Sequence, residues 1–183
     1  MQSFQNTDFT KSPLPPGEYE HCTFTNCNFS NADLSGSKFF DCKFHGCNIS
    51  LVKLEKTTLG DVQFTDCKML GLHFDTCHDF GFSVSFENCI LNHSSFYKTR
   101  LKKTNFKNTQ LHQVDFMESD LAQAVFDNCD LSRAAFNRTI LEKADLRTSF
   151  NYSIDPDLNK IKKAKFSMPG LVGLLDKFDI VVD

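Results

Sequence analysis

Apolar residues recur at every fifth position over most of this chain. A first series runs from Tyr19 to Phe74 and a second from Phe86 to Leu146, and the two are separated by twelve residues where ten would keep the phase. A period of five matches neither the two residues of a β-strand nor the 3.6 of an α-helix. The chain must therefore turn a corner at each repeat and stack coil upon coil, which predicts a β-solenoid with right-angled corners.

The residue two positions before each repeat centre is also small or apolar. Cysteine, alanine, serine, threonine or valine occupies most of these positions, as at Cys22, Ala32 and Val52. Two inward columns leave three positions of each repeat for the solvent, and these carry mostly Asn, Asp, Ser, Lys and Thr. The pattern thus predicts a narrow apolar interior with polar walls.

Two stretches carry a family signature. Residues 31–35 read NADLS and residues 143–147 read KADLR, and both resemble the A(D/N)LXX unit of pentapeptide-repeat proteins. The resemblance extends over most of the chain. It implies an all-β fold, a right-handed quadrilateral β-solenoid with one repeat on each side, in which residues of successive coils stack four repeats apart.

This geometry accounts for the strict alternation of Phe and Leu centres in the second series. Phe centres fall on two opposite sides of the coil and Leu centres on the other two, so large rings meet across the axis while smaller side chains fill the other direction. We therefore expect Phe96, Phe116 and Phe136 to form one straight wall.

We expect three segments along the chain: an N-terminal lead over residues 1–18, a solenoid over residues 19–150, and a C-terminal cap and dimerisation segment over residues 151–183. The lead is expected to be loosely attached, because Pro13, Pro15 and Pro16 have no N–H for a β-ladder. Within the solenoid, the register slip at residues 75–85 must bulge or kink the coil.

The last segment is the most apolar part of the chain outside the repeats. Pro169 is typical of the first turn of a helix, so we expect a short helix over residues 170–177 and an extended stretch over 178–182. The segment is either a lid over the last coil or a dimer seam, and it can be both. Resemblance to the quinolone-resistance type implies an end-to-end homodimer, with these seam residues: Leu171, Leu174, Leu175, Phe178, Ile180 and Val182.

The sequence shows no pattern of a catalytic or metal site. All eight cysteines fall in the inward column, without a CxxC or a Cys/His pair at ligand spacing, so we interpret them as reduced packing residues. Motifs of hydrolases, phosphate-binding loops and zinc proteases are absent. We expect a protein that is not an enzyme, needs no cofactor and binds no metal. The chain has no apolar run typical of a signal peptide or membrane span, which favours the cytoplasm.

The family resemblance also implies a partner. Quinolone-resistance, microcin-immunity and albicidin-resistance proteins are rods that bind DNA gyrase or topoisomerase IV and protect it, an action usually explained as mimicry of duplex DNA. Residues 64–71, 85–92 and 165–169 look most similar to the albicidin-resistance type. The resemblance therefore implies a homodimeric, topoisomerase-binding antibiotic-resistance protein that contacts neither nucleic acid nor membrane directly.

Charge limits the mimicry. The net charge is -3, whereas duplex DNA of the solenoid's expected length carries on the order of 20 charges. Any mimicry of DNA must therefore depend on shape and on a local acidic patch. The first 85 residues hold ten Asp and Glu against six Lys and Arg. The expected patch residues are Asp41, Glu55, Asp61, Asp66 and Asp75. Phe80 and Phe82 in the slip either fold inward as irregular core or contact the partner.

Two other functions fit the same pattern. A structural or scaffolding repeat protein would bind some other protein through its flat faces. Direct nucleic-acid binding would use Lys98, Arg100, Lys102, Lys103 and Lys107, but only Tyr97 is available there for base stacking, which disfavours it.

Overall fold

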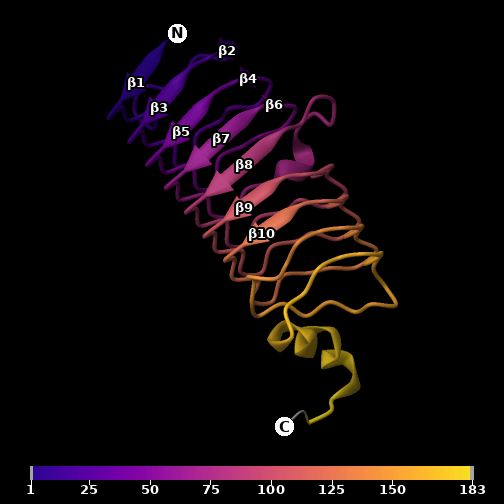
Figure 1. The fold of residues 1–183 in the computed structure, drawn as a ribbon. Coiled ribbons are helices and arrows are strands. Elements are labelled where there is room, and N and C mark those ends of the chain that lie inside the picture. Colours follow the sequence, from indigo (N-terminus) through magenta and orange to yellow (C-terminus); the bar gives the residue numbers. More distant parts are fainter. Residues whose placement is uncertain (1, 182–183) are drawn as a thin grey trace.

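The computed structural model describes residues 2–181, which form a single elongated stack of four-sided coils (Figure 1). The first strand lies at one end of the stack and two short helices lie at the other. Every strand pairing is parallel. The all-β solenoid expected from the five-residue period is confirmed.

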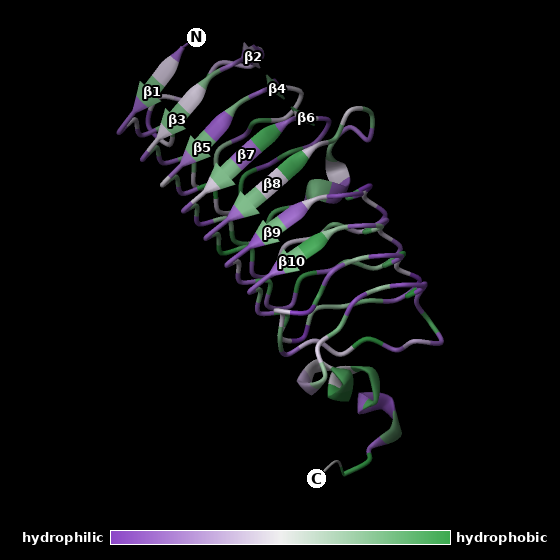
Figure 2. Cartoon of the chain, viewed as in Figure 1, coloured by the Kyte–Doolittle hydropathy of each residue, from purple (hydrophilic) through white to green (hydrophobic). Residues whose placement is uncertain are grey.

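Two of the four sides carry regular strands. A seven-stranded sheet, termed here the β1 side, consists of β1 (Ser3–Gln5), β3 (Thr23–Thr25), β5 (Lys43–His45), β7 (Val62–Thr65), β8 (Val84–Glu87), β9 (Asn105–Lys107) and β10 (Val125–Asp127). The adjoining β2 side begins with β2 (Glu18–Glu20), β4 (Lys38–Phe40) and β6 (Thr58–Gly60). Isolated bridges such as Asn28 to Asn48 and Ser95 to Asp115 hold the remaining sides. Figure 2 shows hydrophilic residues recurring at the corners of successive coils.

Phenylalanine rings dominate the interior. Seven rings stack along the β1 side with centroids 4.6 to 5.4 Å apart: Phe4, Phe24, Phe44, Phe64, Phe86, Phe106 and Phe126. Opposite them, Phe96 stacks on Phe116 at 5.4 Å and Phe116 on Phe136 at 5.3 Å, which confirms the expected straight wall. The two walls meet edge to face, as between Phe96 and Phe106 at 6.2 Å and 85°. This edge-to-face geometry is favoured by the ring quadrupoles.

The small inward column does more than fill space. Its thiols and hydroxyls donate hydrogen bonds to carbonyls of the preceding coil: Cys67 Sγ to Phe44 O at 3.4 Å, Thr139 Oγ1 to Phe116 O at 2.9 Å, and Ser149 Oγ to Phe126 O at 2.7 Å. All eight cysteines are free and buried. Cysteine, threonine and serine are therefore interchangeable here because each offers a small donor, a role that the sequence analysis did not identify.

The corners require left-handed backbone conformations. Asn26, Asp61 and Lys103 have φ values of 53°, 52° and 60°. Asn, Asp and Gly adopt this region most readily. At Gly46, with φ of 64°, a Cβ atom would lie 2.3 Å from Asn26 Oδ1, so the close approach of the neighbouring corner requires glycine.

The register slip is a bulge confined to residues 79–82. Strand β7 pairs with β8 at an offset of 22 residues, as between Phe64 and Phe86. His78 N still donates to Thr57 O at 2.9 Å in the regular manner, and Ser83 N donates to Leu59 O at 2.8 Å. The two extra residues are therefore accommodated between His78 and Ser83, after the 3-10 turn η1 (Phe74–Thr76).

The N-terminal lead is better attached than we expected. Strand β1 pairs in register with β3, the Phe4 ring stacks on Phe24 at 4.8 Å, and Phe9 stacks on Phe29 at 4.5 Å. The expectation of a loose lead was wrong because the prolines affect only residues 13–16. The residues before them already follow the repeat.

The solenoid also continues beyond residue 150. Ile140 bridges Lys160 and Asp145 bridges Lys165 at the regular spacing. The pattern was hidden because buried Asn159 takes the small inward position, where its Nδ2 donates to Phe136 O at 3.2 Å.

The expected C-terminal helix is present as two 3-10 turns. These are η2 (Pro169–Leu174), with the proline in its first turn as expected, and η3 (Asp176–Phe178). Phe178 ends η3, and Asp179 follows in the left-handed conformation with φ of 49°, so the extended stretch does not begin at residue 178. No helix within the described residues has the length and apolar character to cross a bilayer.

Candidate functional site

The five expected acidic residues lie on three corners rather than in one patch. Asp41 and Asp61 share the corner between the β2 and β1 sides, where they precede β5 and β7. Asp66 lies at the far edge of the β1 side, after β7. Glu55 and Asp75 lie on the opposite edge of the β2 side. The coil geometry therefore brings together only the first two and, separately, the last two.

A shallow hollow on the β1 side contains the first pair. It has a volume of about 250 Å³ and is lined by His21, Thr23, Asp41, Lys43, Asp61 and Gln63. His21 Nδ1 lies 3.8 Å from Asp41 Oδ2, and Ser83 Oγ donates to Asp61 Oδ1 at 2.7 Å. Both carboxylates are exposed. The hollow therefore holds two exposed carboxylates beside one lysine, Lys43.

Asp66 has a structural role. The Asn88 amide donates to Asp66 Oδ1 at 3.0 Å, Asn108 donates to Asn88 at 3.1 Å, and Asn128 donates to Asn108 at 2.9 Å. Asp66 is therefore the terminal acceptor of an amide ladder along one corner. Such ladders stabilise stacked coils, so this carboxylate is less available to a partner than Asp41 and Asp61.

The other acidic pair is also engaged with neighbours. Ser35 Oγ donates to Glu55 Oε2 at 2.9 Å, and His73 Nδ1 lies 3.3 Å from Asp75 Oδ1. The Asp75 side chain is only 23% exposed. These two carboxylates therefore offer a weaker docking feature than the hollow.

The two phenylalanines of the bulge lie in different environments. Phe82 packs against the core, and its ring lies edge to face with Phe74 at 6.3 Å. Phe80 is 92% exposed. Phe82 thus follows the alternative of irregular core, whereas Phe80 is the exposed apolar side chain of the bulge.

The C-terminal end combines a cap with exposed apolar surface. Leu174 packs against the core, and Tyr152 lies 5.7 Å from Phe166. The side chains still exposed there include Leu171, Val172, Leu175, Phe178, Ile180 and Val181. The sixth expected seam residue, Val182, lies outside the described residues.

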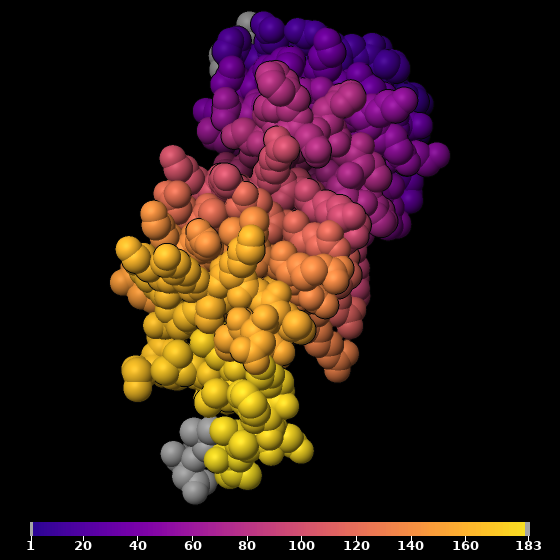
Figure 3. All heavy atoms as spheres, turned by 90° about the vertical axis from the view of Figure 1, so that its right-hand side faces the viewer, coloured from indigo at the N-terminus to yellow at the C-terminus, as the bar shows by residue number. Residues whose placement is uncertain are grey.

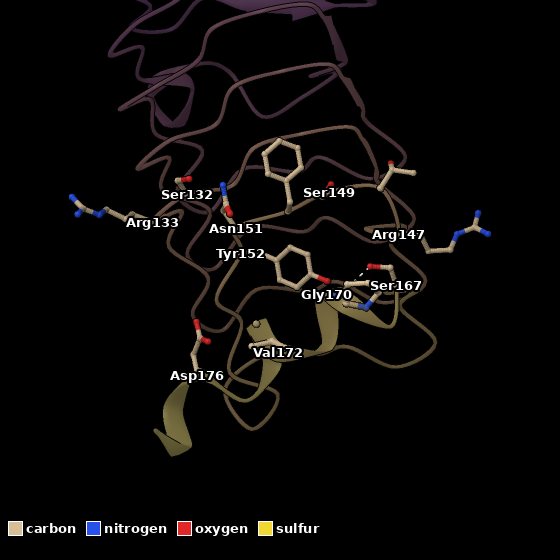
Figure 4. A pocket seen from close by; sticks show the side chains of 14 residues that line it. Ser132, Arg133, Arg147, Ser149, Asn151, Tyr152, Ser167, Gly170, Val172 and Asp176 are labelled. Atoms are coloured by element: carbon tan, nitrogen blue, oxygen red, sulfur yellow. Dashed lines mark hydrogen bonds between the residues drawn. The ribbon is translucent and has the colours of Figure 1, made fainter. Parts of the chain in front are cut away.

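An open pocket of about 790 Å³ separates the last coils from η2 (Figure 4). The Tyr152 side chain points across it towards Gly170, whereas Arg133 and Arg147 point away. A Cβ atom on Gly170 would lie 2.0 Å from the Tyr152 hydroxyl, so glycine allows this close approach. Within residues 2–181, no group of three His, Cys, Asp or Glu side chains is placed to hold a metal ion.

One group of charged residues was missed by the sequence analysis. Lys143, Lys160, Lys162 and Lys163 are exposed on the last two coils, on the β2 side and its corner. The signal was the recurrence of lysine at equivalent corners, at Lys103, Lys143 and Lys163. It was overlooked because the tail was taken to leave the repeat.

Comparison with solved structures identifies full-length matches. QnrB1, described as a plasmid-mediated fluoroquinolone resistance protein, superimposes with a TM-score of 0.64 in its full-length form, at 16% identity over 98% of both chains. One trypsin-treated variant of it gives a TM-score of 0.66 at 17% identity, over 100% of this chain and 98% of that chain. The superpositions show a common fold, and at this level of identity they show the fold alone. No curated protein matches the chain in sequence.

The sequence family is shown independently. A model described as pentapeptide repeat region matches residues 18–78 and 82–151. The gap between the two matches, residues 79–81, lies within the bulge. This chain is therefore a member of the pentapeptide-repeat family.

Proposed function

We propose that this protein binds a type II topoisomerase, DNA gyrase or topoisomerase IV, and protects it from an antibiotic or peptide toxin. The observation that carries the proposal is the match to QnrB1 over nearly the whole of both chains. The protein acts in the cytoplasm by binding alone, without catalysis or a cofactor. Protection requires only that it prefers one state of the topoisomerase over another.

The acidic hollow supports this role. The rod cannot imitate DNA by total charge, since its net charge is -3. Asp41 and Asp61 nevertheless lie next to each other on successive coils of one straight corner. Two carboxylates at about the 4.8 Å spacing of neighbouring strands suit the cationic groove of a DNA-binding enzyme.

Phe80 supplies the second contact. A single phenylalanine exposed on a bulge between otherwise regular coils is suited to insertion into an apolar pocket of the partner. Removing its ring leaves the core contacts of Phe82 intact. Phe80→Ala is therefore a separation-of-function variant, in which protection is lost and the melting temperature is kept.

The proposed active form is a homodimer joined end to end through residues 170–183. Exposed Leu171, Phe178 and Ile180 would be buried in that seam. Light scattering in high salt, where contacts between surface charges are screened, should give a dimer mass for the full chain and a monomer mass after deletion of residues 170–183. A monomer mass for the full chain would contradict this part of the proposal.

A supercoiling assay tests the main proposal. Gyrase or topoisomerase IV is incubated with a fluoroquinolone and increasing amounts of the wild-type protein, and recovery of activity is measured. Asp41→Asn combined with Asp61→Asn should weaken the recovery, while Asp127→Asn on the other half of the β1 side is the matched control. If wild type neither restores nor inhibits either enzyme, the scaffolding function replaces this one.

A further inference from the structure

The β2 side has opposite charges at its two ends. Along its strands and the corner that it shares with the β1 side, the N-terminal half carries five carboxylates and one lysine: Glu18, Glu20, Asp41, Asp61 and Asp79, with Lys38. Its C-terminal half carries seven cations and two carboxylates: Arg100, Lys102, Lys103, Lys143, Lys160, Lys162 and Lys163, with Asp120 and Glu142. Figure 3 views the molecule from this side, with the N-terminal coils above and the C-terminal coils below.

The strand register keeps all these residues on one side. Glu18 pairs with Lys38, and Lys38 with Thr58. Further along, bridges connect Arg100, Asp120, Ile140 and Lys160 in order. Residues 78–83 lie between the acidic and the basic half of the side. The neighbouring sides run past them, because β8 pairs with β9 on one of these sides and Phe74 stacks on Phe96 on another. The rod is thus continuous across the bulge, although the ladder of β2, β4 and β6 ends before it.

Most of these charges have no partner within the chain. Lys38 pairs with Glu18 at 3.1 Å and Lys102 with Asp120 at 3.2 Å. Over the described residues, these cations form no ion pair: Arg100, Lys103, Lys143, Lys160, Lys162 and Lys163. The other corner of the β2 side differs, since Glu118 there pairs with both Lys98 and Arg138. Like charges stacked on successive coils oppose folding slightly, so their retention on the β2 side calls for a compensating partner.

We propose that the β2 side binds the β2 side of a second copy of this chain, with the two rods side by side and antiparallel. A two-fold axis in the interface, near the bulge, places the first coil of one rod against the last coil of the other. Such an interface is isologous, so each contact occurs twice. This association is distinct from the end-to-end seam.

The charges match at the outer coils in this arrangement. Glu18 and Glu20 face Lys160 and Lys162 of the second copy. Asp41 faces Lys143. The third coil departs from this match, because its Asp61 faces the coil that carries Asp120, whose carboxylate pairs with Lys102.

The centre of the interface contains the bulge. Asp79 faces Arg100 and Lys102 across the axis, and the exposed Phe80 lies beside them. Arginine and lysine pack favourably against aromatic rings. Both the charged and the apolar features of the bulge are therefore used near the two-fold axis.

Other occupants fit less well. A nucleic acid would be repelled by the acidic half, and a parallel second copy would place like charges together. Eight coils at about 4.8 Å give a side roughly 35 Å long, and with a width of four residues it buries on the order of 1,000 Å² in total. An interface of this size and polarity is weak and is screened by salt.

A charge-exchange experiment tests the proposal with the full chain. The acidic variant carries Lys143→Glu, Lys160→Glu and Lys162→Glu, and the basic variant carries Glu18→Lys, Glu20→Lys and Asp41→Lys. Each variant alone should associate side by side at least about tenfold more weakly than wild type in about 50 mM salt. An equimolar mixture of the two should regain the association, because both symmetric contacts are again complementary.

Small-angle scattering separates this contact from the end-to-end seam. A side-by-side pair enlarges the cross-section of the rod at nearly constant length, whereas an end-to-end pair doubles the length. Lys53→Glu with Lys68→Glu, on other sides of the rod, is the control and should behave as wild type. The proposal is overturned if the cross-section of wild type is that of a single rod, if it does not respond to salt, or if the mixture does not regain the association.

Discussion

The two halves of the solenoid, before and after the bulge, have the same coil but different interiors. In the first half, rings occupy adjoining sides, so that Phe24 contacts both Phe29 and Phe39 edge to face. In the second half, rings occupy opposite sides and leucines fill the others, as at Leu111 and Leu121. The ring column of the β1 side continues through both halves. The same coil cross-section therefore accommodates two arrangements of rings, and both arrangements keep the ring column of the β1 side.

The halves also differ in their inward donors and in their surfaces. Six of the eight cysteines lie before the bulge, whereas Thr and Ser supply many of the donors after it. Asp and Asn are common at the first corners, while Lys and Arg occupy several later ones, such as Lys103 and Arg133. The corners of both halves require the same left-handed backbone conformation. The difference in charge between the corner residues is therefore not imposed by the fold.

High pH should have the largest effect and should act first on the N-terminal half. Burial raises the pKa of Cys42 to about 11 and that of Cys77 to about 12. The folded state holds these protons more tightly than the unfolded state, whose thiols titrate near 9, so the stabilisation is complete below pH 9 and is lost as the pH rises towards 12. Several such thiols together favour unfolding by on the order of 5 kcal/mol at pH 11.

Hydrogen exchange between pH 8 and 11, corrected for the intrinsic rate, measures this difference. The loss of protection should begin in residues 19–78, whereas residues 90–146 should follow at higher pH. Uniform loss along the chain would show that the thiols do not distinguish the two halves.

Removing one ring from the shared wall should be the most damaging single substitution. Phe106 is fully buried and contacts the rings of Phe86, Phe96, Phe116 and Phe126. Phe106→Ala should lower the free energy of unfolding by about 3 to 5 kcal/mol. Phe106→Leu, which keeps more volume, should cost less. Thermal or urea unfolding measures both, and an unchanged midpoint for the alanine variant would refute the placement of this ring.

The two phenylalanines of the bulge allow a direct comparison of a packed ring with an exposed one. Phe82→Ala removes a half-buried ring that packs on Phe74 and should cost about 1 to 2 kcal/mol, whereas Phe80→Ala should change stability by less than about 0.5 kcal/mol. Both are measured by urea unfolding. Equal costs for the two variants would mean that Phe80 also packs against the solenoid.

The amide ladder should contribute no more than the Phe82 ring. Asn108→Ala removes two ladder hydrogen bonds and places alanine at a φ of 49°, so it should cost about 1 to 2 kcal/mol. Asn108→Gly keeps the left-handed conformation and isolates the loss of the side-chain bonds, so its cost should be smaller. If the glycine variant is as unstable as the alanine variant, the ladder rather than the backbone accounts for the loss.

Much of the fold followed from the spacing of apolar residues alone. The straight Phe96 wall and the Asn88–Asn108 ladder were both predictable, because the period places equivalent residues on one line. The attachment of Phe4 and the continuation to Lys165 were missed, since prolines and the polar inward Asn159 concealed the repeat at the two ends.

The candidate site was less predictable. A residue number assigns a side of the coil, but it does not tell whether a carboxylate is free. Asp66 proved to be the acceptor of a ladder, and Asp61 shares a hydrogen bond with Ser83. The different environments of Phe80 and Phe82 depend on the backbone conformation of the bulge, and this conformation cannot be derived from the five-residue period.

The sequence by itself determined the corner at each repeat, the inward columns and the position of the bulge, because a five-residue period fits neither a straight strand nor a helix. The four sides of the coil followed from the family resemblance. Only the tertiary structure decided which surface charges are paired, which ring of the bulge is exposed and how the two ends close. Those properties depend on contacts between successive coils, where residues some twenty positions apart come within hydrogen-bonding distance.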